Sequence, residues 1–278
     1  MNNSKEKIYF SIIMCCYNSE KYLKETLLSV INQTYQNFEL IIIDDGSTDK
    51  TSDIIKQFID NNKCIDIQNF HIQNSGLAAA RNFGINKARY TWIAIIDHDD
   101  LWLSEKLEIQ KNDILKNNSK KLFFSDFYIL KNQKKESRFK IFKEKDGFDT
   151  PSLDLSKNKA FINLIINGCF IGSSTVIFNK EIIKEIGLFN KNYKFLTDYI
   201  FFIEVSKKYQ LHCSSKVLSI WRNHDDQASY KMSNYYYFEM FFLYKNLILK
   251  ERIGTFYNLI IIKKFTRLFI SYIFNSIR

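Results

Sequence analysis

The segment Phe38-Glu-Leu-Ile-Ile-Ile-Asp-Asp45-Gly-Ser-Thr-Asp49 joins a short apolar run to a turn of polar residues. The run from Phe38 to Ile43 has the length and composition of a strand that is buried on both faces. The turn that begins at Asp44 ends this strand, and residues Thr48 to Ile59 follow as a predicted helix, with Ser47 or Thr48 placed to cap it. This strand, turn and helix form one unit of an α/β fold.

The same order recurs along the first half of the chain. The predicted strands are Ile8–Cys16, Phe38–Ile43, Cys64–Phe70, Tyr90–Ile96 and Leu122–Phe127, and the predicted helices lie around Leu23–Ile31, at Thr48–Ile59, at Gly76–Ala88 and at Ser104–Leu115. Strand and helix repeated four times imply right-handed crossovers and a mainly parallel sheet. Ligands bind at the carboxyl ends of the strands in such sheets, and the polar clusters of this sequence fall there.

The pattern is weaker after Asp126. The stretch from Lys131 to Asp149 is highly charged, and we expect an exposed excursion or a flexible loop there. Regular structure is expected again near Phe161–Asn167, over Gly168–Phe178, in a helix from Glu181 and in another around Tyr199–Lys208.

The bulk composition restricts the classes of partner. The chain has 278 residues, is 46% hydrophobic and carries a formal net charge of +10. A basic excess suits nucleic acid, an anionic membrane surface or a phosphorylated substrate. Nucleic acid is not expected, because the sequence has no Arg-rich tract, aromatic RNA-binding run or Cys/His finger. The five cysteines lack C-x-x-C spacing, and the polar segment Met1–Lys7 lacks the layout of a secretory signal, so a cytoplasmic protein without disulfides is the default expectation.

Two clusters of carboxylates stand at strand ends, Asp44 with Asp45 and Asp97 with Asp99 and Asp100. Several acids in one turn repel one another unless a cation or hydrogen-bond donors meet them. Asp97 and Asp99 alternate by two, so both could project toward one metal ion, and carboxylate oxygens suit Mn²⁺ or Mg²⁺. Such an ion would neutralise the charge on a departing diphosphate. From these residues alone, a solvated acidic turn that caps the next helix is an equally good interpretation.

Four motifs, in this order, resemble the inverting GT-A glycosyltransferases of family 2. They are Ser11-Ile-Ile-Met-Cys-Cys-Tyr-Asn18 with Leu27-x-Ser29-Val30-x-x-Gln33-Thr34, then Phe38 to Asp49, then Asn74-x-Gly76-Leu77-Ala78-x-Ala80-Arg81-Asn82-x-Gly84, then Tyr90 to Asp99. The resemblance covers roughly Tyr9 to Tyr230. It implies a GT-A (Rossmann-like) domain over residues 1–230, and we expect a helical, basic and aromatic C-terminal extension over 231–278. It also implies an enzyme that moves a sugar from a nucleotide sugar, first of all a UDP-sugar, to a hydroxyl of a glycan or lipid-linked glycan.

The resemblance assigns the nucleotide side of the site. Tyr17 and the turn of Asp44 and Asp45 would hold the base and the ribose, and which of the two acids reads the base stays open. An ordinary helix cap is the alternative role for these acids. Arg81 would lie near the diphosphate or the base, or would form a structural ion pair with an acid of the same sheet edge. Asp97 would reach the sugar or ribose.

The resemblance also assigns the metal turn and a late segment. Asp99 would bind Mn²⁺ or Mg²⁺, whereas Asp100 would cap a helix that begins at Leu101. The run Trp221-Arg222-x-His224 resembles the family's segment that closes over the diphosphate, with Arg222 as a phosphate partner and His224 as a metal ligand. A purely structural histidine is the alternative. The run Gly172-Ser173-Ser174 is expected to be an acceptor-side loop or a simple turn.

An inverting transfer is a single in-line displacement at the anomeric carbon, and it needs a base to take the proton of the acceptor hydroxyl. In the family this base belongs to a Glu-Asp pair near the start of a helix. Asp198 aligns with the second member of that pair, while Thr197 replaces the first. Glu204 is the alternative base, and a helix N-terminal acid is the alternative role for Asp198.

The processive relatives carry a Gln-x-x-Arg-Trp segment and membrane helices, whereas this chain has Trp221-Arg222 in the reverse order, which favours single addition. Rival functions are a non-catalytic nucleotide-sugar binder, supported by Thr197, and a sugar nucleotidyltransferase, which the absence of a Gly-rich basic loop disfavours.

The tail from Tyr235 to Arg278 is apolar and aromatic, with interspersed Lys and Arg. Its runs Leu259–Phe265 and Leu268–Tyr272 are typical of an interfacial helix on anionic lipid, where each basic residue contributes about 1 kcal/mol. Packing onto the sheet or onto a second subunit is the equal alternative. Contact with the inner face of the plasma membrane would suit a lipid-linked acceptor in lipopolysaccharide or surface polysaccharide synthesis.

Overall fold

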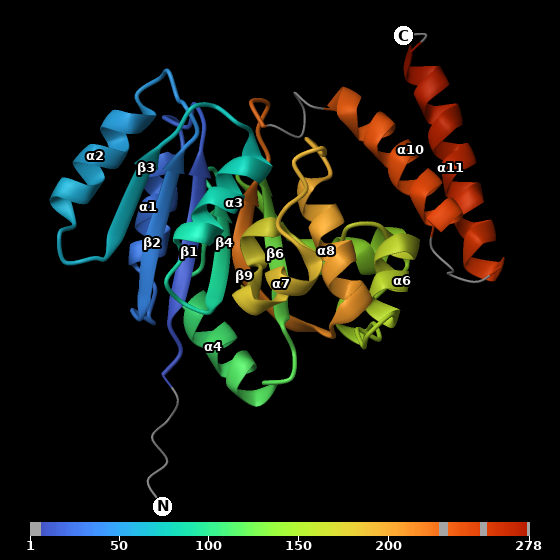
Figure 1. Cartoon of the computed structure of the whole chain (residues 1–278), viewed down its shortest axis with the longest axis horizontal. Helices are drawn as coiled ribbons and strands as arrows, with labels where there is room; N and C mark the ends of the chain where they lie inside the picture. Colours follow the sequence, from blue (N-terminus) through green and yellow to red (C-terminus); the bar gives the residue numbers. More distant parts are fainter. Residues whose placement is uncertain (1–6, 228–232, 251–254, 277–278) are drawn as a thin grey trace, which may run out of the picture.

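A computed structural model describes residues 7–227, 233–250 and 255–276 (Figure 1). In these residues the chain forms a nine-stranded sheet with helices on both faces. The strands are β1 (Phe10–Cys16), β2 (Phe38–Asp44), β3 (Ile67–His71), β4 (Trp92–Asp97), β5 (Leu101–Trp102), β6 (Leu122–Lys131), β7 (Lys134–Ser137), β8 (Ile177–Asn179) and β9 (Leu211–Arg222). The α-helices are α1 (Leu23–Ile31), α2 (Thr51–Asn61), α3 (Leu77–Lys87), α4 (Lys106–Lys116), α5 (Arg138–Ile141), α6 (Lys159–Asn167), α7 (Ile183–Ile186), α8 (Thr197–Lys208), α10 (Ser233–Lys250) and α11 (Thr255–Ser276).

The sheet has a parallel half and a mixed half. Its order is β3-β2-β1-β4-β8-β6-β9-β5, with β7 paired to β6. The first four strands are all parallel. The short β8 then runs antiparallel to both β4 and β6, while β6 and β9 are parallel. The predicted α/β fold is confirmed, and its predicted parallel repeat corresponds to the first half of the sheet.

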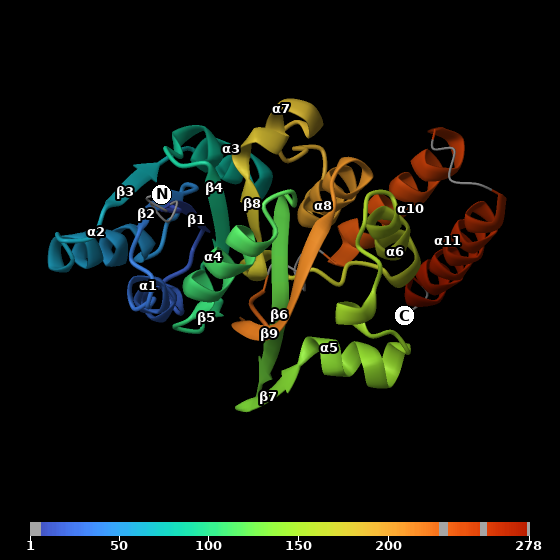
Figure 2. The ribbon, with the colours of Figure 1, turned by 90° about the horizontal axis from the view of Figure 1, so that it is seen from below.

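Alternate residues of the buried strands face two separate cores. Ile12 and Met14 of β1 pack with α1, α2 and α4, whereas Ile13 and Cys15 pack with α3, α6 and α8. Successive side chains of a strand point to opposite faces, so a strand covered by helices on both sides must be apolar throughout. Figure 2 shows α1 and α3 on opposite faces of the sheet.

Most of the stretch from Lys131 to Asp149 is exposed, as the first of the two expected alternatives has it, but regular secondary structure replaces the expected loop. This stretch contains the end of β6, then β7, α5 and a π-helical turn, Phe142–Asp146. Phe139 and Phe142 are buried in the larger core, while most lysines of the stretch remain exposed. The high charge therefore belongs to the outer face of an ordered element, whose few aromatic residues anchor it.

Two predicted helix starts also differ from the structure. The α2 helix begins at Thr51, and neither Ser47 nor Thr48 caps it; Oδ1 of Asp49 accepts the Thr51 N–H at 3.0 Å. The helix expected from Glu181 is a 3-10 turn followed by the single turn α7.

The C-terminal helices lie side by side at the end of the molecule away from α2 (Figure 1). One face of α10 belongs to the larger core through Met240, Leu243, Tyr244 and Leu247. The expected boundary between residues 230 and 231 lies outside the described residues. In the described part of the chain, no helix combines the length and apolarity needed to cross a bilayer.

Lys106, in the first turn of α4, is fully buried. Its contacts in the described part of the chain are neutral, since Nζ donates to Oε1 of Gln110 and lies 4.3 Å from the centre of the Trp102 ring. Burial lowers the pKa of Lys106 well below its usual value. The unfolded chain therefore binds this proton more readily than the folded one, and the free energy of unfolding rises with pH between the folded pKa and about 10.4.

We expect Lys106→Met to stabilise the protein more at pH 7 than at pH 9.5. One proton contributes a slope of at most about 1.4 kcal/mol per pH unit, which the variant loses. Urea unfolding of both proteins at several pH values measures the difference. The control is Lys111→Met, which removes a lysine of the same helix that pairs with Glu108. A difference between wild type and Lys106→Met that does not change with pH would contradict the lowered pKa of Lys106.

Candidate active site

The turns after β1 and β2 interlock at the carboxyl edge of the sheet. The Asn18 N–H donates to Oγ of Ser47 at 3.0 Å, and Oδ1 of Asn18 accepts the Thr48 N–H at 2.8 Å. Asn18 has a φ of 48°, a left-handed conformation that asparagine tolerates better than most residues. The predicted base-binding residue Tyr17 precedes Asn18 in the first of these turns, and 48% of its surface is exposed.

Asp44 is buried at the end of β2, and three groups of the chain meet its carboxylate. Oδ1 accepts the Ser47 N–H at 3.0 Å, while Oδ2 accepts the Ser52 hydroxyl and contacts Nδ1 of His71 at 3.0 Å. Burial by itself raises the pKa of Asp44, but the hydrogen bonds from Ser47, Ser52 and His71 outweigh it and lower that pKa. Asp44 therefore stays an anion and shapes the turn.

Asp45 organises the start of α3. Its Oδ1 accepts the Ser75 N–H at 2.8 Å, and its Oδ2 accepts the Gly76 N–H at 2.9 Å. Gly46 makes this approach possible, because it has a φ of 75° and a Cβ there would lie 2.8 Å from the backbone nitrogen of Asn74. The second and third sequence motifs thus meet through Asp45 and Gly46.

Arg81 joins two acids that are 101 residues apart in the sequence. Its side chain is buried, with Nη1 bonded to Oδ1 of Asp198 and Nη2 bonded to Oδ1 of Asp97 at 2.6 Å and to Oγ of Ser173 at 3.3 Å. Burial lowers the pKa of Arg81, but the carboxylates of Asp198 and Asp97 outweigh it and raise that pKa. Burial likewise raises the pKa of Asp97, against the opposing effect of Arg81. The ion pair expected as one alternative for Arg81 is present, and it brings Asp97 and Asp198 to one place.

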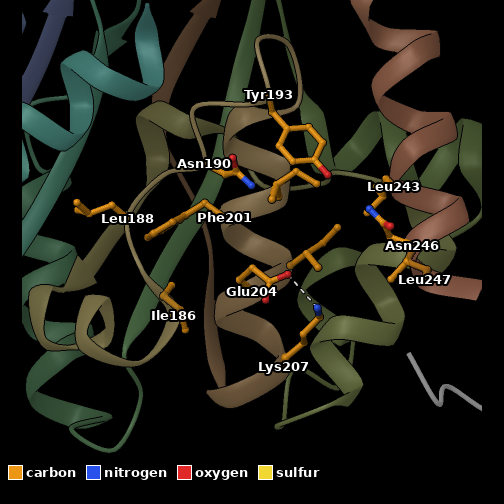
Figure 3. Close-up of a pocket in the computed structure, with 12 residues that line it drawn as sticks. Ile186, Leu188, Asn190, Tyr193, Phe201, Glu204, Lys207, Leu243, Asn246 and Leu247 are labelled. Carbon is orange, nitrogen blue, oxygen red and sulfur yellow. Dashed lines mark hydrogen bonds and ion pairs between the residues drawn. The ribbon is translucent and has the colours of Figure 1, made fainter. Parts of the chain in front are cut away.

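Asp198 lies in the first turn of α8, whereas Glu204 lies two turns further along. Glu204 pairs with Lys207 at 2.9 Å and lines a cavity of about 450 Å³ between the 186–193 segment, α8 and α10 (Figure 3). The described contacts thus bring Asp198, and not Glu204, to Arg81. Thr197, which stands where the family has glutamate, donates its hydroxyl to the Tyr193 carbonyl at 2.9 Å.

Asp99 and His224, the two residues predicted to bind a metal ion, contact each other in the structure. Nε2 of His224 lies 3.1 Å from Oδ2 of Asp99, and Nδ1 of His224 is buried with no hydrogen-bond partner among the described residues. No group of three or more His, Cys, Asp and Glu side chains in the described part of the chain is arranged to hold a metal ion. A pair of this kind fits Mn²⁺ or Mg²⁺ only where phosphate oxygens and water complete the coordination, which is usual for Mg²⁺ in phosphate-binding sites.

Arg222, at the end of β9, contacts two residues of the segment 22–25 near the start of α1. It pairs with Glu25 at 2.5 Å, and its guanidinium lies 5.0 Å from the centre of the Tyr22 ring, which also contacts the His224 ring. Nη1 of Arg222 is buried and has no partner in the described structure. Tyr22 and Glu25 were not predicted as site residues, because nothing in the sequence distinguishes them from other polar positions at the start of a helix.

Asp100 does not cap a helix, contrary to the prediction. Its Oδ2 accepts the Ser174 hydroxyl at 2.6 Å and its Oδ1 accepts the Arg222 N–H at 3.2 Å, while Leu101 and Trp102 form β5 rather than a helical turn. Burial, followed by the charge of Asp99, raises the pKa of Asp100 well above its usual range. Asp100 thus ties the acidic turn to β9 and to the 3-10 turn Ser173–Thr175.

Solved structures share this architecture. Staphylococcus aureus TarS 1–349 in complex with UDP-GlcNAc superimposes with a TM-score of 0.66 at 20% identity, covering 95% of this chain and 73% of that one. The mannosyltransferase PcManGT of Pyrobaculum calidifontis, in complex with GDP-Man and Mn²⁺, gives 0.60 at 14% identity, covering 88% and 63%. These similarities confirm the predicted GT-A fold.

Sequence relatives are also glycosyltransferases. An uncharacterized glycosyltransferase of Haemophilus influenzae is 50% identical over 107 residues, 38% of this chain and 42% of that protein. One of Rickettsia typhi is 31% identical over 219 residues, 79% and 65% of the respective chains. The Escherichia coli UDP-Glc:alpha-D-GlcNAc-diphosphoundecaprenol beta-1,3-glucosyltransferase WfgD is 29% identical over 197 residues, 71% and 69%. The chain thus spans less than two thirds of the length of the first two relatives.

The family profile covers most of the elements that build the site. Glycosyl transferase family 2 matches residues 11–187, which is more than half of the chain and includes the interlocked turns, Arg81 and the acidic turn of β4. The chain belongs to glycosyltransferase family 2.

Proposed function

We propose that the protein is an inverting, metal-dependent glycosyltransferase of the hexosyltransferase type that adds single sugars from a UDP-sugar to a hydroxyl of a glycan or lipid-linked glycan. The observation that carries this proposal is the bridge from Asp97 through Arg81 to Asp198, because it puts a carboxylate of the second half of the chain beside the donor edge of the first. Synthesis of lipopolysaccharide or another surface polysaccharide is the proposed setting.

Named relatives and neighbours support the substrate class. TarS structures hold UDP or UDP-GlcNAc, and WfgD is named for UDP-Glc and a diphosphoundecaprenol-linked acceptor. Tyr17 and the turn of Asp44 and Asp45 are proposed to hold the base and ribose, since they lie at the carboxyl ends of the parallel strands, where ligands of such sheets bind.

The proposed reaction is a single displacement. The acceptor oxygen bonds to the anomeric carbon as the bond from that carbon to the donor diphosphate breaks, and the acceptor proton passes to Asp198. Arg81 engages Oδ1 of Asp198, which orients the carboxylate and leaves Oδ2 to take the proton. Arg222 would bind the departing diphosphate through Nη1. Asp99 and His224 would hold Mn²⁺ or Mg²⁺, which supplies positive charge to the diphosphate when bound.

We expect Asp198→Asn to lower the transfer rate by about 10²–10⁴-fold, the usual contribution of a general base, with UDP binding retained. Nucleotide release from UDP-sugars in the presence of acceptor gives the rate, and the UDP-dependent rise in melting temperature gives the binding. Glu204→Gln is the matched control and is expected to stay close to wild type. Loss of transfer in Glu204→Gln with full activity in Asp198→Asn would reverse the two roles. Specific UDP-sugar binding without transfer to any acceptor would favour the non-catalytic binder.

For the metal pair, we expect Asp99→Asn and His224→Ala to remove most of the extra stabilisation that Mn²⁺ gives in the presence of UDP. The melting temperature is measured with UDP alone, with Mn²⁺ alone and with both. His212→Ala is the control histidine, because His212 pairs with Asp113 and is not part of the Asp99 contact. A full Mn²⁺ effect in both variants would disprove the proposed metal ligands.

We also propose that α10 and α11 rest on the inner face of the plasma membrane. Phe238, Phe242 and Leu249 leave one stripe of α10 exposed, and Phe238 and Leu249 are 72% and 70% exposed. On α11 the exposed apolar residues are Phe256, Leu259, Ile262, Phe269 and Ile270, and exposed Lys263 and Arg267 lie among them. Apolar and basic residues on one surface fit anionic lipid headgroups above acyl chains.

Reversing two of these charges, Lys263→Glu with Arg267→Glu, is expected to weaken binding to phosphatidylserine-containing vesicles by about 30-fold or more, since each basic residue contributes about 1 kcal/mol near the surface. Vesicle sedimentation measures the affinity, and vesicles of phosphatidylcholine alone serve as the control. Unchanged affinity for the anionic vesicles would contradict the membrane-facing role of α11.

A further inference from the structure

The segment that leads into α8 is held by a carboxylate from α10. Oε1 of Glu239 accepts the Lys194 N–H at 2.7 Å, and Oε2 accepts the N–H groups of Phe195 and Leu196 at 3.1 and 2.8 Å. Glu239 is buried, with 5% of its surface exposed. Three successive backbone N–H groups around one carboxylate form an anion-binding nest, which compensates the cost of burying the charge.

This nest lies directly before the residue proposed as the catalytic base. The α8 helix begins at Thr197, and its N-cap residue, Leu196, has no side chain that could accept a hydrogen bond. The backbone N–H groups at a helix start need acceptors, and a negative charge there is favourable. Glu239, 42 residues after Thr197 in the sequence, supplies both an acceptor and a negative charge. Asp198 lies two residues after Leu196, the last residue whose N–H Glu239 binds.

Neighbouring residues of α10 strengthen this contact. Tyr235, one turn before Glu239, accepts a hydrogen bond from Nζ of Lys194 at 3.3 Å. Leu243, one turn after it, is buried and lines the cavity beside Tyr193 (Figure 3). Residues four apart lie on one face of a helix, so Tyr235, Glu239 and Leu243 contact the segment 193–196 from the same face of α10.

We propose that Glu239 is a positioning residue for the transfer reaction: it fixes the start of α8, so that the carboxylate of Asp198 meets Arg81 beside the donor edge. This inference rests on the proposed role of Asp198. The inference implies that the geometry of the active site depends on the contact between Glu239 of α10 and the backbone of residues 194–196. The turns at the ends of β1 and β2, which are proposed to hold the base and ribose, have no described contact with Glu239, so UDP binding is expected to change little when Glu239 is replaced.

The test compares Glu239→Ala and Glu239→Gln with Leu247→Ala in the full-length chain. Leu247 is a buried apolar residue of the same helix that has no hydrogen bond to the segment 194–196, so its truncation loosens α10 without emptying the nest. The turnover number is measured with the UDP-sugar that supports transfer by the wild type. The dissociation constant of UDP with Mn²⁺ and the hydrogen exchange of the amides of residues 194–196 are measured on the same proteins.

The expected result is a turnover number about 10- to 100-fold lower in Glu239→Ala, because small displacements of a catalytic group have effects of this size. Glu239→Gln should be intermediate, since its carboxamide oxygen can still accept from part of the nest. Both variants should exchange the amides of residues 194–196 faster and should bind UDP within about twofold of wild type. Leu247→Ala should keep its turnover number even if its melting temperature falls as far.

Equal turnover numbers in Glu239→Ala and Leu247→Ala would overturn the inference, and so would unchanged amide exchange in Glu239→Ala. The Asp198→Asn variant identifies which proposal has failed. If Asp198→Asn is inactive while Glu239→Ala is fully active, the positioning role of Glu239 is wrong and the catalytic role of Asp198 stands. If Asp198→Asn is itself fully active, the proposed base is wrong and the inference falls with it.

Discussion

The guanidinium group of Arg81, buried between Asp97 and Asp198, connects the two halves of this molecule. Arginine loses much hydration when it is buried, and the loss is tolerable only where carboxylates with good geometry replace water. The buried position of Arg81 therefore depends on both Asp97 and Asp198, and each of these carboxylates depends on Arg81 for its opposite charge. Since Asp97 ends the last strand of the parallel half and Asp198 lies in the first turn of α8, the bridge determines how α8 is placed relative to the parallel half of the sheet.

Other polar contacts reinforce the same junction. Asp100 binds Ser174 and the backbone of Arg222, and the Arg222 side chain reaches Glu25 near the start of α1. Three segments that are distant in the sequence are thus tied to the turn that follows β4. Arg222 keeps Nη1, and His224 keeps Nδ1, buried without a described partner. Buried polar atoms of this kind are rare in native structures, and these two lie where we propose that the diphosphate and the metal ion bind.

The features that could be predicted from the sequence are those set by neighbouring residues along the chain. Continuous apolar runs such as Phe38–Ile43 can be buried only between two layers of helices, so the parallel half and the polar turns at its edge could be predicted. Arg81, Asp97 and Asp198 were selected from motifs, but no periodicity could show that one guanidinium holds both acids. Contacts across 117 and 197 residues depend on the short strand β8 and on β9, which carry little pattern of their own. The charge of Lys131–Asp149 indicated its exposure, but it could not reveal the secondary structure, because only a few residues such as Phe139 and Phe142 anchor this stretch in the core.

For the C-terminal helices too, the sequence pattern alone could not predict the arrangement. The α10 sequence is apolar nearly all round, so its composition cannot distinguish the face that joins the core from the face that stays exposed. A helix of this kind requires an apolar environment on both sides. The structure supplies one side through Met240, Leu243 and Leu247, and leaves the stripe of Phe238, Phe242 and Leu249 uncovered. The single acid of the helix, Glu239, is on the covered side, where its carboxylate meets the backbone before Asp198. An anionic side chain has no stable place in an apolar interior without donors, so the nest at residues 194–196 fixes the rotation of α10 and thereby determines which of its faces remains exposed.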